Sequence, residues 1–109
     1  MQSRRPRRAE PGVSNYQLTV RAQRHLQAIF EFSIERFGER QADKYRASLL
    51  ACFDLLAENP KLGRLSPTIR PGMRRHEHGS HVIIFREEVD ARIVIGAILH
   101  KRQMLALKL

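Results

Sequence analysis

A single glycine, Gly38, separates two amphipathic segments, and this arrangement constrains the fold more than any other feature of the sequence. Across residues 21–37 apolar side chains recur every three or four positions, which is typical of a helix with one buried face. The same periodicity runs over residues 39–58 and ends at Asn59–Pro60, a pair that terminates helices. Two helices joined by one residue must turn back on each other, so the sequence predicts an antiparallel helical hairpin. The predicted buried stripes are Ala22, Leu26, Ile29, Phe30, Ser33 and Phe37 on the first helix, and Ala42, Tyr45, Leu49, Cys52, Phe53 and Leu56 on the second.

Segments that favour β-structure precede and follow the predicted hairpin. Residues 16–20 alternate apolar and polar side chains, which indicates a first strand. After a loop over residues 61–72, which contains two glycines and two prolines, come three further β-prone runs: residues 73–77, 81–87 and 92–99. Gly79–Ser80 and residues 88–90 are expected to form the turns between these runs. The last run is apolar on both faces, as expected of a strand inside a sheet.

The predicted element order is therefore β-α-α-β-β-β, an α+β fold. The helical hairpin has the apolar stripes needed to cover one face of a small, mostly antiparallel sheet. The opposite face of the sheet is then expected to carry the basic residues. The length of 109 residues predicts a single domain.

Positive charge is concentrated at the two ends of a chain whose net charge is +9. Residues 1–14 hold four arginines and one glutamate with almost nothing to bury, so they are expected to form a basic, disordered tail. Basic and acidic groups balance over residues 15–59, whereas residues 60–109 hold ten basic and four acidic groups. A concentrated positive field favours an anionic partner, although charge of this size also serves solubility.

Cysteine usage and hydropathy indicate where the protein works. Cys52 is the one cysteine, which excludes an intramolecular disulfide and fits a reducing compartment. Because it lies on the second apolar stripe, we interpret it as a small core residue and not as a nucleophile. No apolar run approaches the ~20 residues that span a bilayer, and no apolar segment follows the basic N-terminus. The sequence thus predicts a cytoplasmic protein without membrane contact.

Seven short stretches between residues 16 and 102, taken in order along the chain, carry a resemblance to a known family. They are residues 16–19 (YQLT), 26–32 (LQAIFEF), 36–42 (RFGERQA), 56–64 (LAENPKLGR), 74–75 (RR), 79–86 (GSHVIIFR) and 95–102 (IGAILHKR). Together they resemble the ParE-like toxins of the RelE/ParE superfamily, the toxin half of bacterial type II toxin–antitoxin pairs. The resemblance implies that residues 15–109 form a toxin domain with this superfamily's fold.

The resemblance also implies partners. A toxin of this kind is neutralised by a cognate ParD-like antitoxin and meets operator DNA only indirectly, through that antitoxin. ParE-type members poison DNA gyrase, whereas RelE-type members cleave messenger RNA in the ribosome. A third alternative is an inactive member that survives only as a co-repressor.

The residues available for catalysis favour the gyrase-binding alternative. RNA cleavage needs groups that activate the 2′-hydroxyl, stabilise the phosphorane and protonate the leaving oxygen. The loop before the sheet carries no carboxylate, Phe85 stands where many relatives have tyrosine, and no tyrosine follows His100. The remaining candidates for proton transfer are His76, His78, His81 and His100. We therefore assign no catalytic residue.

Two sets of binding residues are predicted. Contact with the target is assigned to Arg74, Arg75, Arg86, His100, Lys101 and Arg102, with Arg74 expected to be the structural exception because it projects opposite to Met73 and Arg75. Contact with the antitoxin is assigned to Leu50, Leu55, Arg75, Arg86 and Arg92. His76, His78 and His81 could hold zinc or nickel, but nothing completes a ligand set, so no metal and no cofactor are predicted.

Overall fold

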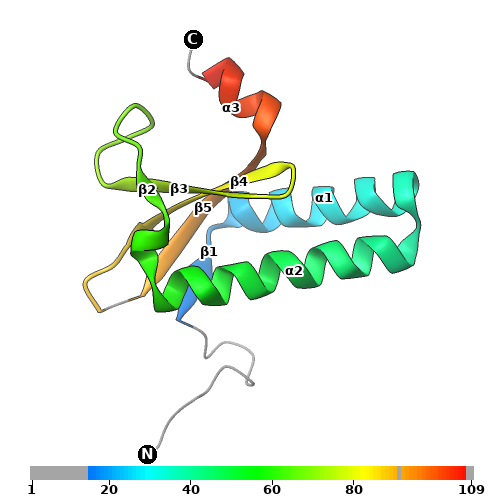
Figure 1. The fold of residues 1–109 in the computed structure, drawn as a ribbon, viewed down its shortest axis with the longest axis horizontal. Helices are drawn as coiled ribbons and strands as arrows, with labels where there is room; N and C mark the ends of the chain where they lie inside the picture. The colour runs from blue at the N-terminus through cyan, green and yellow to red at the C-terminus, as the bar shows by residue number, and fades with distance from the viewer. Residues whose placement is uncertain (1–14, 91, 108–109) are drawn as a thin grey trace, which may run out of the picture.

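The protein is described by a computed structural model that covers residues 15–90 and 92–107. The predicted tail, residues 1–14, lies outside the described part of the chain. Two long helices lie side by side along the sheet, and a third, short helix lies beyond it (Figure 1). Among the described residues no helix is long and apolar enough to cross a membrane.

The predicted helical hairpin is confirmed, with helix α1 at Val20–Phe37 and helix α2 at Glu39–Glu58. Thr19 is the N-cap of α1, because its side chain accepts a hydrogen bond from the backbone N–H of Ala22 at 3.1 Å. Gly38 joins the helices with φ +90° and ψ 163°, a conformation that is essentially restricted to glycine. The turn between the helices therefore depends on this glycine.

The sheet has five strands in the order β1-β5-β4-β3-β2. The strands are β1 Tyr16–Leu18, β2 Arg64–Leu65, β3 Met73–His78, β4 His81–Glu87 and β5 Ile93–His100. Strand β1 pairs with β5 in parallel and the other neighbours are antiparallel, so the α+β prediction with a mostly antiparallel sheet is confirmed. The apolar strand β5 lies between β1 and β4, as its sequence indicated.

Beyond the end of β1, hydrogen bonds from α1 and its N-cap to β5 take the place of backbone hydrogen bonds between the two strands. The Thr19 hydroxyl donates to the carbonyl of Gly96 at 3.1 Å. The backbone N–H of Ile98 donates to Nδ1 of His25, also at 3.1 Å. Backbone groups of β5 that β1 is too short to reach are thereby satisfied by side chains of the first helix and its cap.

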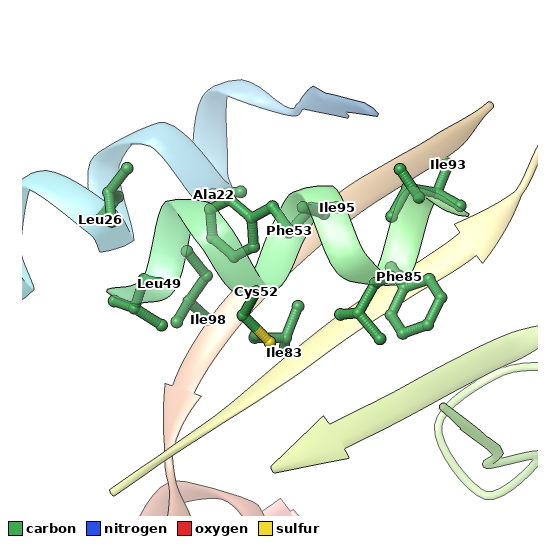
Figure 2. Packing of buried hydrophobic residues seen from close by; sticks show 12 residues of the cluster. Ala22, Leu26, Leu49, Cys52, Phe53, Ile83, Phe85, Ile93, Ile95 and Ile98 are labelled. Atoms are coloured by element: carbon green, nitrogen blue, oxygen red, sulfur yellow. The ribbon is translucent and has the colours of Figure 1, made fainter. Parts of the chain in front are cut away.

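The main core lies between the hairpin and one face of the sheet (Figure 2). Phe53 and Leu49 of α2 are fully buried and face Ile83 and Phe85 of β4 and the isoleucines of β5. Cys52 is buried in this cluster, as its place on the apolar stripe indicated. Phe37 was wrongly placed on the buried stripe, because it lies at the tip of the hairpin beyond the sheet and is 63% exposed.

The opposite face of the sheet, here called the outer face, carries apolar side chains as well as the predicted basic residues. Val82, Ile84 and Ala97 form a second buried cluster there, with Met73 packed against it. Met104 completes this cluster from helix α3, Lys101–Leu107, an element that the sequence pattern did not predict. The predicted loop 61–72 also contains more structure, namely a 3₁₀ turn at Pro60–Leu62 and edge strand β2. All three missed elements, helix α3, the 3₁₀ turn and strand β2, are too short to show a periodic pattern.

Candidate binding surfaces

The register of the sheet divides the predicted target-binding residues between two places. Residues paired across neighbouring antiparallel strands point to the same face. Arg75 pairs with Ile84 and Arg86 pairs with Met73, so both arginines project from the outer face. His100 pairs with His81 on the side of the helical hairpin. The predicted set is therefore not one continuous site.

Three basic side chains gather on the outer face around acidic neighbours. Glu77 lies 3.6 Å from both Arg75 and Lys101, and Arg86 Nε lies 2.9 Å from Glu88. Arg75 is mostly buried, and its Nε has no hydrogen-bond acceptor among the described residues. The Arg86 and Lys101 pairs are about half exposed, so they stabilise the fold by no more than ~1 kcal/mol each. The cations of these pairs are thus available to an anionic partner.

Arg74 projects toward the hairpin side and is used within the fold. Its side chain is 14% exposed, donates to the carbonyl of Gly63 at 2.8 Å and contacts Glu87 at 3.1 Å. Because it joins the segment before β2 to the end of β4, it has the geometry of a structural arginine. The expectation that Arg74 differs from Arg75 fits this placement.

A basic groove of about 810 Å³ lies between the second half of α1 and the ends of β4 and β5. Its lining is Ala28, Ile29, Phe32, Ser33, Arg36, Phe37, Gln41, Tyr45, Ser80, His81, His100 and Arg102. Among the described residues that line it there is no aspartate or glutamate. The groove thus combines apolar and aromatic side chains with two arginines and two histidines.

One wall of the groove is held by hydrogen bonds from α2. The Tyr45 hydroxyl donates to the carbonyl of His78 at 3.2 Å and lies 2.7 Å from Nδ1 of His81. Ser48 Oγ lies 2.9 Å from Nε2 of His78. Burial, followed by the nearby His100 and His78, lowers the pKa of His81 to about 4. Burial and His76 likewise lower the pKa of His78.

These contacts concern two hypotheses from the sequence, proton transfer by the histidines and a metal site formed by them. His78 and His81, two candidates for proton transfer, are occupied by hydrogen bonds inside the fold, and burial lowers the pKa of both imidazoles. His100 accepts a hydrogen bond at Nδ1 from the backbone N–H of Arg102 at 3.1 Å. Within residues 15–90 and 92–107, no group of three or more histidine, cysteine, aspartate or glutamate side chains is arranged to hold a metal ion.

The structure separates the residues predicted to contact the antitoxin. Leu50 is half-buried and packs against the main core, whereas Leu55 is 51% exposed. Five residues along a helix correspond to a rotation of roughly 140°, so these leucines do not share a face. Arg92 is exposed at the start of β5, 3.8 Å from Asp90. Phe32 and Arg36 of the groove were not predicted, because their importance follows from the packing of α1 over the strand ends.

The architecture has a counterpart among solved structures. A chain described as "Chromosomal ParDE TA system from P. aeruginosa" superposes with a TM-score of 0.67 at 22% identity, covering 80% of this chain and 95% of that one. At this identity the similarity concerns the fold alone. A helical hairpin on one face of a five-stranded, mostly antiparallel sheet thus defines the class as a small α+β domain.

Sequence comparison gives the family within that class. The family described as "ParE toxin of type II toxin-antitoxin system, parDE" matches residues 16–105, so the chain belongs to this family of ParE toxins. Toxin ParE1 of Mycobacterium tuberculosis (strain H37Rv) is 37% identical over 89 residues, 82% of this chain and 91% of that toxin. Toxin ParE1 of Caulobacter vibrioides is 37% identical over 86 residues, 79% and 88% of the two chains. The resemblance identified from the sequence is thereby confirmed.

Proposed function

We propose that this ParE-family chain arrests growth by binding DNA gyrase, without cutting nucleic acid itself, and that a ParD-like antitoxin neutralises it. Gyrase binding and neutralisation by the antitoxin would both take place in the cytoplasm. In this proposal the chain meets operator DNA only through the antitoxin. The observation that carries this proposal is the use of His78 and His81 inside the fold.

Proton transfer is what distinguishes a nuclease from a binding toxin. An RNase of this fold needs a general base and a general acid beside a bound phosphate, each with a pKa near the working pH. Tyr45 contacts the Nδ1 side of His81, and the pKa of about 4 keeps this imidazole in its neutral form at pH 7, which is a poor general acid. The described residues supply cations for binding far more readily than a pair for acid–base catalysis.

The outer face provides the contact with gyrase in this proposal. Arg86 and Lys101 are exposed there and make only surface ion pairs, so their exchange for contacts with an acidic surface costs little. Helix α3 lies beside them and covers the apolar cluster of Val82, Ile84 and Ala97. The outer face thus presents positively charged side chains on a rigid sheet.

The test is inhibition of gyrase by the purified protein. Wild-type protein should block supercoiling, and its expression without antitoxin should cause filamentation and DNA-damage signalling. Arg86→Glu should weaken inhibition at least about tenfold, because it places a like charge against the acidic target surface. Arg40→Glu, an exposed reversal on α2, is the matched control and should inhibit like wild type.

Two results would contradict the proposal. Rapid cleavage of messenger RNA at codon-defined positions, with gyrase unaffected, would assign the chain to the RelE-type activity. Normal growth with neither effect, from a protein that still binds its antitoxin, would identify an inactive co-repressor.

A further inference from the structure

We propose that the outer face of the sheet binds the phosphate backbone of duplex DNA through a row of three arginines, Arg64, Arg75 and Arg86. This inference rests on the proposed gyrase target and deepens it, because it names the phosphates of the DNA that gyrase holds as the anions that the toxin contacts. Contacts of this kind fix the position of a protein on the duplex without reading its base sequence.

The row follows from the register of three neighbouring strands. Arg64 of β2 pairs with Arg75 of β3, so both side chains project from the outer face. Arg86 of β4 pairs with Met73, two residues before Arg75, and therefore lies diagonal to Arg75 on that face. Neighbouring strands are about 5 Å apart, which brings the three arginines next to one another. A fixed row of cations matches an anion whose charge repeats regularly, as a DNA duplex does at about every 1.7 Å of its axis.

The positive charge of this row is only partly compensated within the fold. Like charges directly opposite each other destabilise a pair of strands, yet Arg64 is exposed and forms an ion pair with no carboxylate of the described residues. Arg75 lies 3.6 Å from Glu77, and its buried Nε has no acceptor among those residues. Together with Arg86 and Lys101, the two arginines share only the two carboxylates of the ion pairs described above. Two of the four charges thus remain for an external anion.

The placement of the aromatic side chains favours a duplex over a single strand. Proteins that hold single-stranded nucleic acid stack its bases on aromatic rings. The two tyrosines and five phenylalanines of the chain all lie in the main core or on the helical hairpin, away from the outer face. They are Tyr16, Phe30, Phe32, Phe37, Tyr45, Phe53 and Phe85. The outer face instead presents guanidinium groups, which pair with phosphate oxygens in a forked geometry.

The experiment measures binding of the full chain, without gyrase, to a fluorescently labelled DNA duplex by anisotropy at several KCl concentrations. Each cation that contacts a phosphate adds about 0.9 to the slope of log K against log salt concentration. Arg64→Gln and Arg86→Gln should therefore each lower this slope by about one and weaken the affinity about tenfold at low salt. The double variant should lower the slope by about two.

The chain offers a matched control in Arg40→Gln. Arg40 is an exposed arginine on α2, which covers the opposite face of the sheet, so its loss removes the same charge but should leave the slope unchanged. Arg40, Arg64 and Arg86 are all exposed, so no variant should lower the unfolding temperature by more than a few degrees. The four arginines of residues 1–14 are present in every variant, and their contribution cancels in the comparison.

The outcomes separate this inference from the proposed function. An equal slope for wild type, Arg64→Gln and Arg86→Gln, or no binding of the duplex by wild type, would overturn the DNA assignment. If gyrase inhibition still fell in both variants, the proposed function would stand and the outer face would contact an acidic protein surface. Tighter binding of a single strand than of the duplex would also overturn the assignment. Duplex binding that depends on both arginines, with gyrase unaffected, would overturn the gyrase target and leave the DNA site standing.

Discussion

The hydroxyl of Tyr45, in the middle of α2, lies 2.7 Å from Nδ1 of His81, the first residue of β4. This contact joins the hairpin to the end of the sheet, where the half-buried Tyr45 packs against the main core. It holds the His81 ring against His100, with centroids 5.4 Å apart, and so shapes the wall of the basic groove. The packing of the hairpin on the sheet and the shape of the groove thus depend on the same few polar side chains.

Stability should fall as the pH is lowered from about 6.5 to about 4. Burial lowers the pKa of His25, His78 and His81, the last to about 4, whereas an unfolded chain has histidines near 6.5. Between these values the unfolded state binds protons that the folded state does not, so acid favours unfolding. Thermal unfolding from pH 7.5 to 4 measures this, and His81→Gln should flatten the curve. An equally steep curve for His81→Gln would show that other groups cause the loss.

Gly63→Ala should destabilise the fold by about 1–3 kcal/mol, because the new methyl group overpacks the core. A Cβ at this position would lie 2.5 Å from Cζ of Phe85, a ring that is fully buried. Phe85→Leu in the same chain should reduce the cost of Gly63→Ala, and a urea double-mutant cycle measures that coupling. Gly38→Ala should also destabilise, through its positive φ, but without coupling to Phe85, because apart from the adjoining backbone no atom of the described residues lies within 4 Å of its added Cβ.

Leu49→Ala should cost about 2–5 kcal/mol of unfolding free energy, and Leu56→Ala a similar amount, since both side chains are fully buried in the main core. Leu55→Ala on the same helix provides the control and should change stability by no more than about 0.5 kcal/mol. Chemical denaturation of the three variants tests this. Equal losses at positions 49 and 55 would mean that α2 packs through a different face.

Arg74→Ala and Arg86→Ala should separate stability from function. Arg74 joins Gly63 to Glu87, so its loss should destabilise the fold by about 1–3 kcal/mol. Arg86 makes an exposed ion pair, so its loss should cost under about 1 kcal/mol yet weaken gyrase inhibition. Denaturation and supercoiling assays on the same preparations compare them. A destabilised Arg86→Ala together with an unchanged Arg74→Ala would reverse their assigned roles.

The sequence predicted the hairpin closely, and for a physical reason. The bounds of α2 follow from Gly38 and Asn59–Pro60, which act through local backbone geometry. Strands β4 and β5 were likewise visible in long apolar runs. Helix α3 was missed because a helix of seven residues, anchored by the buried Met104, is too short to leave a periodic signal.

The binding surfaces were harder to predict than the fold. Alternation along β3 correctly placed Arg74 and Arg75 on opposite faces. The groove, however, needs Phe32, Arg36, His100 and Arg102 from three separate elements, and no local pattern encodes their proximity. Their juxtaposition depends on how far α1 extends past the strand ends, which only tertiary packing determines.

The pairing of β1 with β5 limits how far the chain can fold while it is being synthesised on the ribosome. Tyr16 lies beside Ile93, so the earliest strand to be synthesised must wait for one of the latest. Until β5 is translated, the nascent chain can form the local hairpin of α1 and α2, but their apolar stripes have no sheet to cover. A chain that terminates prematurely before β5 would therefore stay incompletely folded and be degraded by proteases. It would not form a shorter version of the toxin.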